Sequence, residues 1–297
     1  MRRRRPGHGN ARRTHRVALA LVGVFLAFAS SVVWGTADFF GGSLSRRLPA
    51  FAVSLWSQAA GFVALCVFAA ARGDVSERSF LLGLAAGAGG GAGLALFYRA
   101  LALGTMSVVS PLVACGAVVP FVISIATGER PAALAVVGAL AAICGAVLAS
   151  VEERRASSAD RARAIVLAIG AAVALGLFVY FLGLGSRDGD ALSTLLGARV
   201  GSLSLLVVAS GVARAPLRIP RRALLPVAAV GLADVSANAL FAAASSHGLL
   251  ALVSVLGSLY PVTTVLLAHL LLHERLTRAQ QAGIAVALGG VALIAAA

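Results

Sequence analysis

The sequence predicts an all-α integral membrane protein with ten transmembrane helices, arranged as two inverted repeats of five helices each. Three observations support this fold class: the composition, the lengths of the apolar segments and a similarity between the two halves of the chain. Of the 297 residues, 60% are hydrophobic and only 12% are charged, whereas a soluble domain has about 45–50% apolar and about 25% charged residues. This composition excludes a water-soluble fold and a disordered chain.

The charged residues indicate where the apolar segments end. The formal net charge is +14, with 25 arginines and no lysine against 11 acidic residues. A nucleic-acid-binding protein would gather its basic side chains on one soluble face. Here the arginines lie between long uncharged segments, so we expect a lipid bilayer and no nucleic acid as partner.

Ten segments are long enough to cross a membrane. A spanning helix needs about 20 predominantly apolar residues, because the hydrocarbon core is about 30 Å thick. Strands are excluded because an open strand leaves its backbone without partners in lipid. In chain order the predicted helices are Val17–Ala37, Ala50–Ala71, Phe80–Leu103, Thr105–Thr127, Pro131–Val151, Ala164–Ser186, Ala191–Ala213, Ala223–Ser246, Leu249–Leu272 and Ala279–Ala297.

Residues 1–16 precede the first predicted helix and hold seven arginines. A signal peptide has an apolar core of only about 7–15 residues, so Val17–Ala37 is interpreted as a retained helix that follows a disordered basic tail. Arginines are nearly balanced between the inner and outer loops. We expect the protein in the cytoplasmic membrane. Because the first helix usually dominates orientation, the dense basic tail favours a position of both termini in the cytoplasm.

An internal repeat relates the two halves. A shift of 144 residues pairs Phe97 with Phe241, and a shift of 145 pairs Glu129-Arg130 with Glu274-Arg275. The second shift also pairs two glycines of the fifth helix with two of the tenth: Gly138 with Gly283 and Gly145 with Gly290.

The repeat divides the chain into residues 17–151 and 164–297, joined by a charged linker at 152–163. Each half contains five predicted helices. Because five is odd, the second half enters the membrane inverted relative to the first. Inverted repeats are typical of secondary transporters, which hold the substrate near the midplane between the halves.

From Val17 onward the sequence resembles the EamA domains of the drug/metabolite transporter (DMT) superfamily. The residues that carry the resemblance are Trp34-Gly35, Phe97-Tyr98-Arg99-Ala100-Leu101, Pro111, Pro120, Tyr260-Pro261, Gly128-Glu129-Arg130 and His273-Glu274-Arg275-Leu276. The resemblance implies export or exchange of small metabolites, such as amino acids or other amphipathic solutes, by alternating access. A drug or quaternary-cation exporter is the alternative, although the small multidrug relatives carry a glutamate in the first span that Val17–Ala37 lacks.

Other classes of function have less support. No catalytic triad or nucleotide-binding motif is evident, so we expect no enzyme and no cofactor, and energy from a gradient of protons or another coupling ion. Few histidines lie close together: His269 and His273 are four residues apart, without an evident third metal ligand other than Glu274. We therefore expect no metal site. A scaffold protein without a transported solute remains as a further alternative, and the chain is expected to be a monomer or homodimer.

Four charged residues within or beside the predicted spans are candidate binding residues: Asp38, Arg99, Arg199 and Asp234. A charge at the bilayer centre costs about 2.5–3.5 kcal/mol on insertion scales, so such a residue usually faces a cavity or a partner. Arg199 and Asp234 lie deep in their spans, where they either line a pathway or neutralise each other. Arg199 could also bind a substrate carboxylate. Asp38 and Arg99 lie near span ends and could reach the interface.

Helical spacing groups further candidates with these charges. Asp234 and Asn238 share one helix face, and Trp34 and Asp38 share another. An aromatic ring beside an acid suits a cationic ligand, although Trp34 also fits the interfacial aromatic belt. The remaining candidate binding residues are Gln58, Tyr98 and Tyr260.

Glycines and prolines have separate predicted roles. Gly83, Gly87 and Gly91 form a small-residue stripe for close helix packing. Three prolines inside spans are predicted to bend helices or to mark gates, and Glu129 and Glu274 to cap the helices that follow them. These prolines are Pro111, Pro120 and Pro261.

Overall fold

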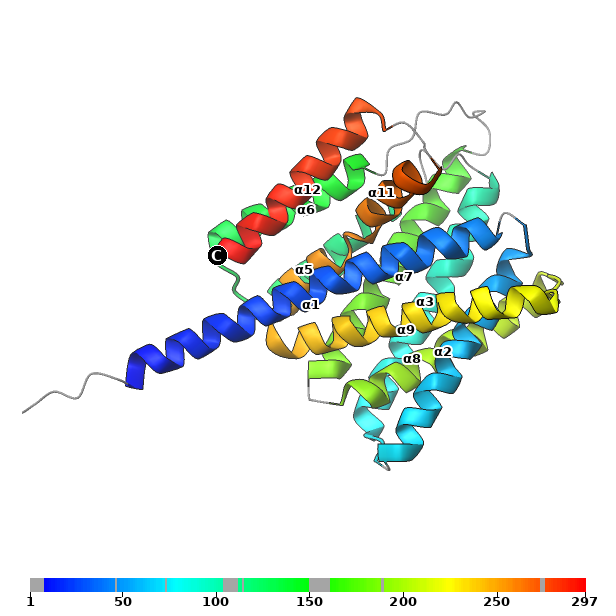
Figure 1. The fold of residues 1–297 in the computed structure, drawn as a ribbon, viewed down its shortest axis with the longest axis horizontal. Helices are drawn as coiled ribbons and strands as arrows, with labels where there is room; N and C mark the ends of the chain where they lie inside the picture. Colours follow the sequence, from blue (N-terminus) through cyan, green and yellow to red (C-terminus); the bar gives the residue numbers. More distant parts are fainter. Residues whose placement is uncertain are drawn as a thin grey trace, which may run out of the picture.

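The computed structural model describes residues 8–45, 47–72, 74–103, 112–113, 115–149, 161–187, 190–272 and 276–297. These residues form a helical bundle without strands (Figure 1). Its elements are α1 His8–Ser45, α2 Ala50–Arg72, α3 Glu77–Leu103, the 3-10 helix η1 Cys115–Ala117, α5 Val118–Ala126, α6 Ala133–Ala149, α7 Arg161–Arg187, α8 Ala191–Val212, α9 Arg221–His247, α10 Leu250–Gly257, α11 Tyr260–Leu272 and α12 Arg278–Ala296.

The all-helical membrane fold is confirmed. Within the described residues, eight helices are long and apolar enough to cross a membrane. Two predicted spans correspond to shorter apolar helices, Cys115–Ala126 and Ala133–Ala149. Part of the predicted span Thr105–Thr127 lies outside the described residues. The other, predicted as Pro131–Val151, begins two residues later, after a loop that holds Glu129 and Pro131.

The first helix extends beyond both predicted ends. It begins at His8, so residues 8–16 of the tail expected to be disordered are helical, and it ends at Ser45. Once a helix has nucleated, each further residue adds a hydrogen bond, so the helix continues past its apolar part. As a result Asp38, which the sequence placed just past the end of a span, lies within the helix and seven residues before its last residue.

The predicted ninth span is interrupted. The structure replaces Leu249–Leu272 with α10 and α11, which are separated by a turn at Ser258 and Leu259. Pro261 lies in the first turn of α11, where its missing N–H costs no helix hydrogen bond. The same residue would break a continuous helix, because it cannot donate to the carbonyl four residues before it. At the equivalent place in the first half, the short helix η1 precedes α5.

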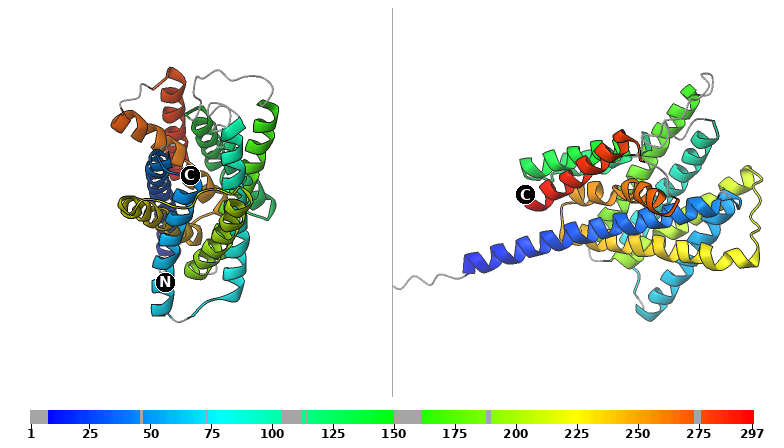
Figure 2. Two further views of the ribbon diagram at one scale, coloured as in Figure 1. Left: turned by 90° about the vertical axis from the view of Figure 1, so that its right-hand side faces the viewer. Right: turned by 45° about the horizontal axis from the view of Figure 1, so that its top comes forward.

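The two halves interleave instead of forming separate bundles. α3 packs along α7 and α8, α1 packs along α9 and α11, and α2 packs along α9 (Figure 1). α6 and α12 pack against each other at one side of the bundle, as Figure 1 and the right view of Figure 2 show. Most long helix contacts therefore join residues from different halves.

The glycines of α3 allow its backbone to touch that of α8. A Cβ atom at Gly83 would lie 2.1 Å from the carbonyl oxygen of Thr194, and one at Gly87 would lie 2.2 Å from that of Ala198. Gly91 faces Leu205 one turn further on. Since both residue numbers rise together, α3 and α8 run in the same direction.

The last helices of the two halves meet through their repeat-related glycines. A Cβ at Gly138 would lie 2.8 Å from the Gly290 carbonyl oxygen, and one at Gly145 would lie 2.7 Å from that of Gly283. Because one residue number rises as the other falls, α6 and α12 are antiparallel. The glycine contact is the main connection of α12 to the rest of the protein.

Candidate functional site

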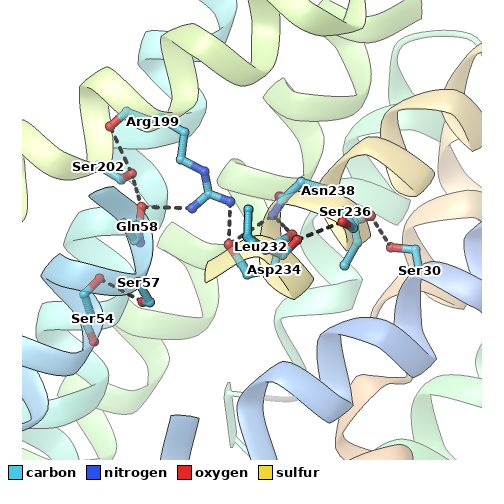
Figure 3. A network of polar contacts seen from close by, with 11 residues as sticks. Ser30, Ser54, Ser57, Gln58, Arg199, Ser202, Leu232, Asp234, Ser236 and Asn238 are labelled. Carbon is cyan, nitrogen blue, oxygen red and sulfur yellow. Dashed lines mark hydrogen bonds and ion pairs between the residues drawn. The ribbon is translucent and has the colours of Figure 1, made fainter. Parts of the chain in front are cut away.

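A network of polar side chains joins α2, α8 and α9 in the middle of the bundle (Figure 3). Arg199 on α8 is its centre. The guanidinium donates a hydrogen bond to Gln58 Oε1 at 3.0 Å and forms an ion pair with Asp234. Gln58 Oε1 also accepts a hydrogen bond of 2.6 Å from the Ser202 hydroxyl. The structure thus brings three predicted site residues from three helices into direct contact.

Helical spacing and one close backbone contact position these side chains. Arg199 and Ser202 are three residues apart and therefore project from one face of α8. On the neighbouring helix α9, Gly231 lies one turn before Asp234. A Cβ at Gly231 would lie 1.8 Å from the carbonyl oxygen of Ser57, so the absence of a side chain lets α2 approach and brings Gln58 to Arg199.

Asn238 completes the network on α9. Its amide donates to the backbone carbonyl of Asp234 at 2.6 Å and to the Asp234 carboxylate at 3.3 Å. The side chain is buried. Asn238 therefore orients the Asp234 carboxylate. The two residues are four apart on one face of α9, as the sequence indicated.

The two charges of the ion pair differ in burial. The side chain of Arg199 is 7% exposed, whereas that of Asp234 is 33% exposed. Both terminal nitrogens of Arg199 already have partners in Gln58 and Asp234. The guanidinium of Arg199 therefore has little exposed surface for a ligand, and the more accessible group of the ion pair is the Asp234 carboxylate.

Asp38 and Tyr260 adjoin this network from α1 and α11. Asp38 is exposed, and it interacts electrostatically with Asp234 and with the Tyr260 phenol. Among the described residues it has no hydrogen bond or ion pair. Two carboxyl groups thus interact with each other, and the ion pair with Arg199 is made by Asp234.

One face of α1 changes from buried to exposed along its length. Ala27, Ser31 and Trp34 on this face are buried, whereas Asp38 is exposed. One turn further, a Cβ at Gly42 would have no atom within 4 Å. The exposed part of this face therefore begins at Asp38, whose carboxylate also interacts electrostatically with Asp234 and Tyr260, and it continues to Gly42.

Trp34 lies on the buried part of the same face of α1. It is 8% exposed, and its ring centroid lies 5.6 Å from that of Phe241. Its ring also approaches Gly257 at the end of α10. The indole therefore packs inside the bundle, one turn from Asp38, and does not belong to an aromatic belt on the lipid-facing surface.

Several predicted site residues are not joined to the network. Arg99 is exposed and shares no hydrogen bond or ion pair with the network among the described residues. Pro120 is buried in α5. Pro111 lies outside the described residues, as do the side chains of Tyr98 and Pro261. No group of three or more histidine, cysteine or acidic side chains that could hold a metal ion occurs in the described part of the chain.

Glu129 caps a different helix from the one predicted. The sequence assigned it to the start of the following helix, but its carboxylate accepts the backbone N–H groups of Leu250 at 2.9 Å and Ala251 at 2.8 Å. It also forms an ion pair with Arg187. The first turn of α10 has no capping side chain of its own, so Glu129 supplies one from the other half. Its counterpart Glu274 lies outside the described residues.

Replacing Gln58 with leucine is expected to lower the free energy of unfolding by about 1–3 kcal/mol, because it leaves a buried N–H donor of Arg199 without its acceptor. Denaturant unfolding of the purified protein in detergent measures this change. Gln281→Leu, at an exposed position of α12, is the matched control. Equal stabilities of the two variants would contradict the role assigned to Gln58.

Comparison with known proteins agrees with this architecture. The sequence matches the EamA-like transporter family over residues 21–151 and 162–296. No curated protein matches it. A solved structure described only as a crystal structure of a protein is similar in fold, with a TM-score of 0.73 and 18% identity over 91% of this chain and 94% of that chain.

Proposed function

Because the chain belongs to the EamA-like transporter family of the DMT superfamily, we propose that this multi-pass membrane protein is a secondary transporter that moves small amphipathic metabolites by alternating access. The observation that carries the proposal is the exposed carboxylate of Asp38 beside the partly exposed Asp234 at the centre of two interleaved halves. Charged groups at such depth are retained in membrane proteins where they serve a pathway.

Ten spans in two inverted halves are part of this proposal. α6 and α12 are the last helices of their halves, and their repeat-related glycines meet in antiparallel orientation. The contact of α1 with α9 has its counterpart in that of α7 with α3, and the contact of α2 with α9 in that of α8 with α3. The pattern of helix contacts is therefore unchanged when the two halves are exchanged. This symmetry supports inverted repeats and a substrate site between the halves.

The residues proposed to bind substrate are Asp38, Asp234, Tyr260 and Trp34. Asp38 and Asp234 present carboxylates, Tyr260 a phenol and Trp34 an aromatic ring, whereas Arg199, Gln58 and Asn238 hold Asp234 in place. A protonated amine on an otherwise apolar solute fits this arrangement, because carboxylates and ring faces both attract positive charge. Amino-acid-like metabolites carry such an amine.

Export of drugs or quaternary cations is the second candidate function. The second carboxyl group, that of Asp38, and the one-turn spacing of Trp34 and Asp38 on α1 favour it. In either case we propose that the protein resides in the cytoplasmic membrane with both termini in the cytoplasm, and that a proton or another ion gradient supplies the energy.

Replacing Asp38 with asparagine is expected to reduce transport at least about tenfold, because it removes a carboxylate that forms no hydrogen bond or ion pair with the part of the chain that the structure describes. The measurement is uptake into proteoliposomes of a panel of labelled amino acids, amines and tetraphenylphosphonium. Asp74→Asn, at an exposed position before α3, is the control and should transport like the wild type. Transport of no compound by the wild type, or equal transport by Asp38→Asn, would contradict the proposal.

A further inference from the structure

The contacts of Glu129 connect three segments at one end of the bundle. It lies in the loop between α5 and α6 and binds both the last residue of α7, Arg187, and the first turn of α10. Arg187 also donates to the Gly248 carbonyl oxygen at 3.5 Å. One side chain of the first half thereby connects two helices of the second half.

This end of the bundle is closed. Leu182, Ser186, Ser245 and Leu250, from α7, α9 and α10, are each at most 1% exposed. A Cβ at Gly183 would lie 2.1 Å from a methyl carbon of Leu250. These four buried residues are called the closed end below.

The exposed residues Asp38 and Gly42 lie towards the other end of the bundle. α1 runs antiparallel to α9: Gly23 is level with Gly248, and Gly41 is level with Val230. The closed end is therefore level with Gly23, whereas Asp38 and Gly42 lie 15 or more residues further along α1, which is about 22 Å or more at 1.5 Å per residue. Asp38 and Gly42 are called the open end below.

We propose that the contacts of Glu129 with Arg187 and α10 keep the closed end shut, and that their release lets this end open. This role of Glu129 is called the latch below. The inference rests on the proposed transport function, because a pathway with one open end needs a second end that can open. α10 is only eight residues long and is separated from α11 by the turn at Ser258 and Leu259. Release of Glu129 frees the first turn of α10 from the loop before α6, so that α10 can move away from α7.

The charge and both oxygens of Glu129 are required for the latch. Oε1 accepts from Leu250 and Arg187, and Oε2 accepts from Ala251. A negative charge also interacts favourably with the positive end of the α10 dipole. In Glu129→Gln the amide NH2 replaces one acceptor with a donor that faces a second donor, and the ion pair with Arg187 is lost.

Two cysteine reporters test the latch in a protein without its native Cys66, Cys115 and Cys144. Ser245→Cys reports on the closed end and Gly42→Cys on the open end. Each is combined with Glu129→Gln or with the matched control Glu77→Gln, an exposed carboxylate at the start of α3. The rate of labelling by a charged maleimide is measured in nanodiscs, where the reagent reaches both membrane faces.

Glu129→Gln is expected to raise labelling at Ser245→Cys at least about tenfold, which corresponds to about 1.4 kcal/mol, and to lower labelling at Gly42→Cys. Glu77→Gln should change neither rate. Unfolding cannot produce this result, because it would raise both rates.

The remaining outcomes separate the latch from the transport proposal. An unchanged rate at Ser245→Cys, or a rise at both reporters, overturns the latch. A rise at Ser245→Cys with no change at Gly42→Cys supports the latch but contradicts alternating access. Absence of labelling at both reporters in every variant contradicts the pathway itself, and the latch with it.

Discussion

Replacing Asp234 with alanine is expected to abolish transport and to lower the free energy of unfolding by about 3 kcal/mol. The change leaves the guanidinium of Arg199, 7% exposed, without its counter-ion. Removing one partner of a buried ion pair typically costs about 3–5 kcal/mol. The lower end applies here because the Asp234 side chain is one third exposed.

A double variant separates the structural effect from the functional one. Arg199→Met combined with Asp234→Leu removes both charges, and such replacements are often neutral or stabilising. We therefore expect the double variant to regain stability in denaturant unfolding while transport stays absent. Transport by Asp234→Ala, or by the combination of Arg199→Gln with Asp234→Asn, would refute the assigned site.

Replacing Gly231 with alanine is expected to destabilise the protein by about 2–3 kcal/mol and to impair transport. The new methyl group would lie 1.8 Å from the Ser57 carbonyl oxygen. Because this oxygen belongs to the backbone, the clash is relieved only if α2 and α9 move apart. Overpacking of this kind typically costs about 1–3 kcal/mol. Separation also withdraws Gln58, the neighbour of Ser57, from Arg199.

Gly289→Ala is the matched control for this variant. Gly289 also lies within a helix, α12, but a Cβ there would have no atom within 4 Å. Since alanine favours a helix over glycine by up to about 1 kcal/mol, this variant should be as stable as the wild type or slightly more so. Thermal unfolding in detergent compares the two; equal melting temperatures would show that the contact at Gly231 is not tight.

Hydropathy and length sufficed to predict the helices because lipid allows the backbone few other structures. They did not predict the division of the ninth span, since Ser258 and Leu259 are compatible with a helix and only Pro261 signals the interruption. The long first helix was missed at both ends for a related reason. Its ends at His8 and Ser45 lie in polar sequence, where hydropathy does not report helix boundaries.

The candidate site was predictable where a residue has an unusual cost. Arg199 and Asp234 stood out because a charge in a membrane needs a partner, and the structure pairs them. Ser202 was missed because serine is common in membrane helices and carries no such signal. The capping role of Glu129 at α10 could not be found, because Leu250 and Ala251 are 121 and 122 residues away in sequence.

The interleaving of the two halves has a consequence for how the protein is made. While the ribosome has delivered only α1 to α6, the glycine faces of α3 and α6 have no neighbours, because these are supplied by α7, α8 and α12. Neither half is then an independent folding unit, and assembly must wait for the final helix. Two fragments divided between residues 150 and 160 should each be degraded when synthesised alone and should complement each other when co-expressed.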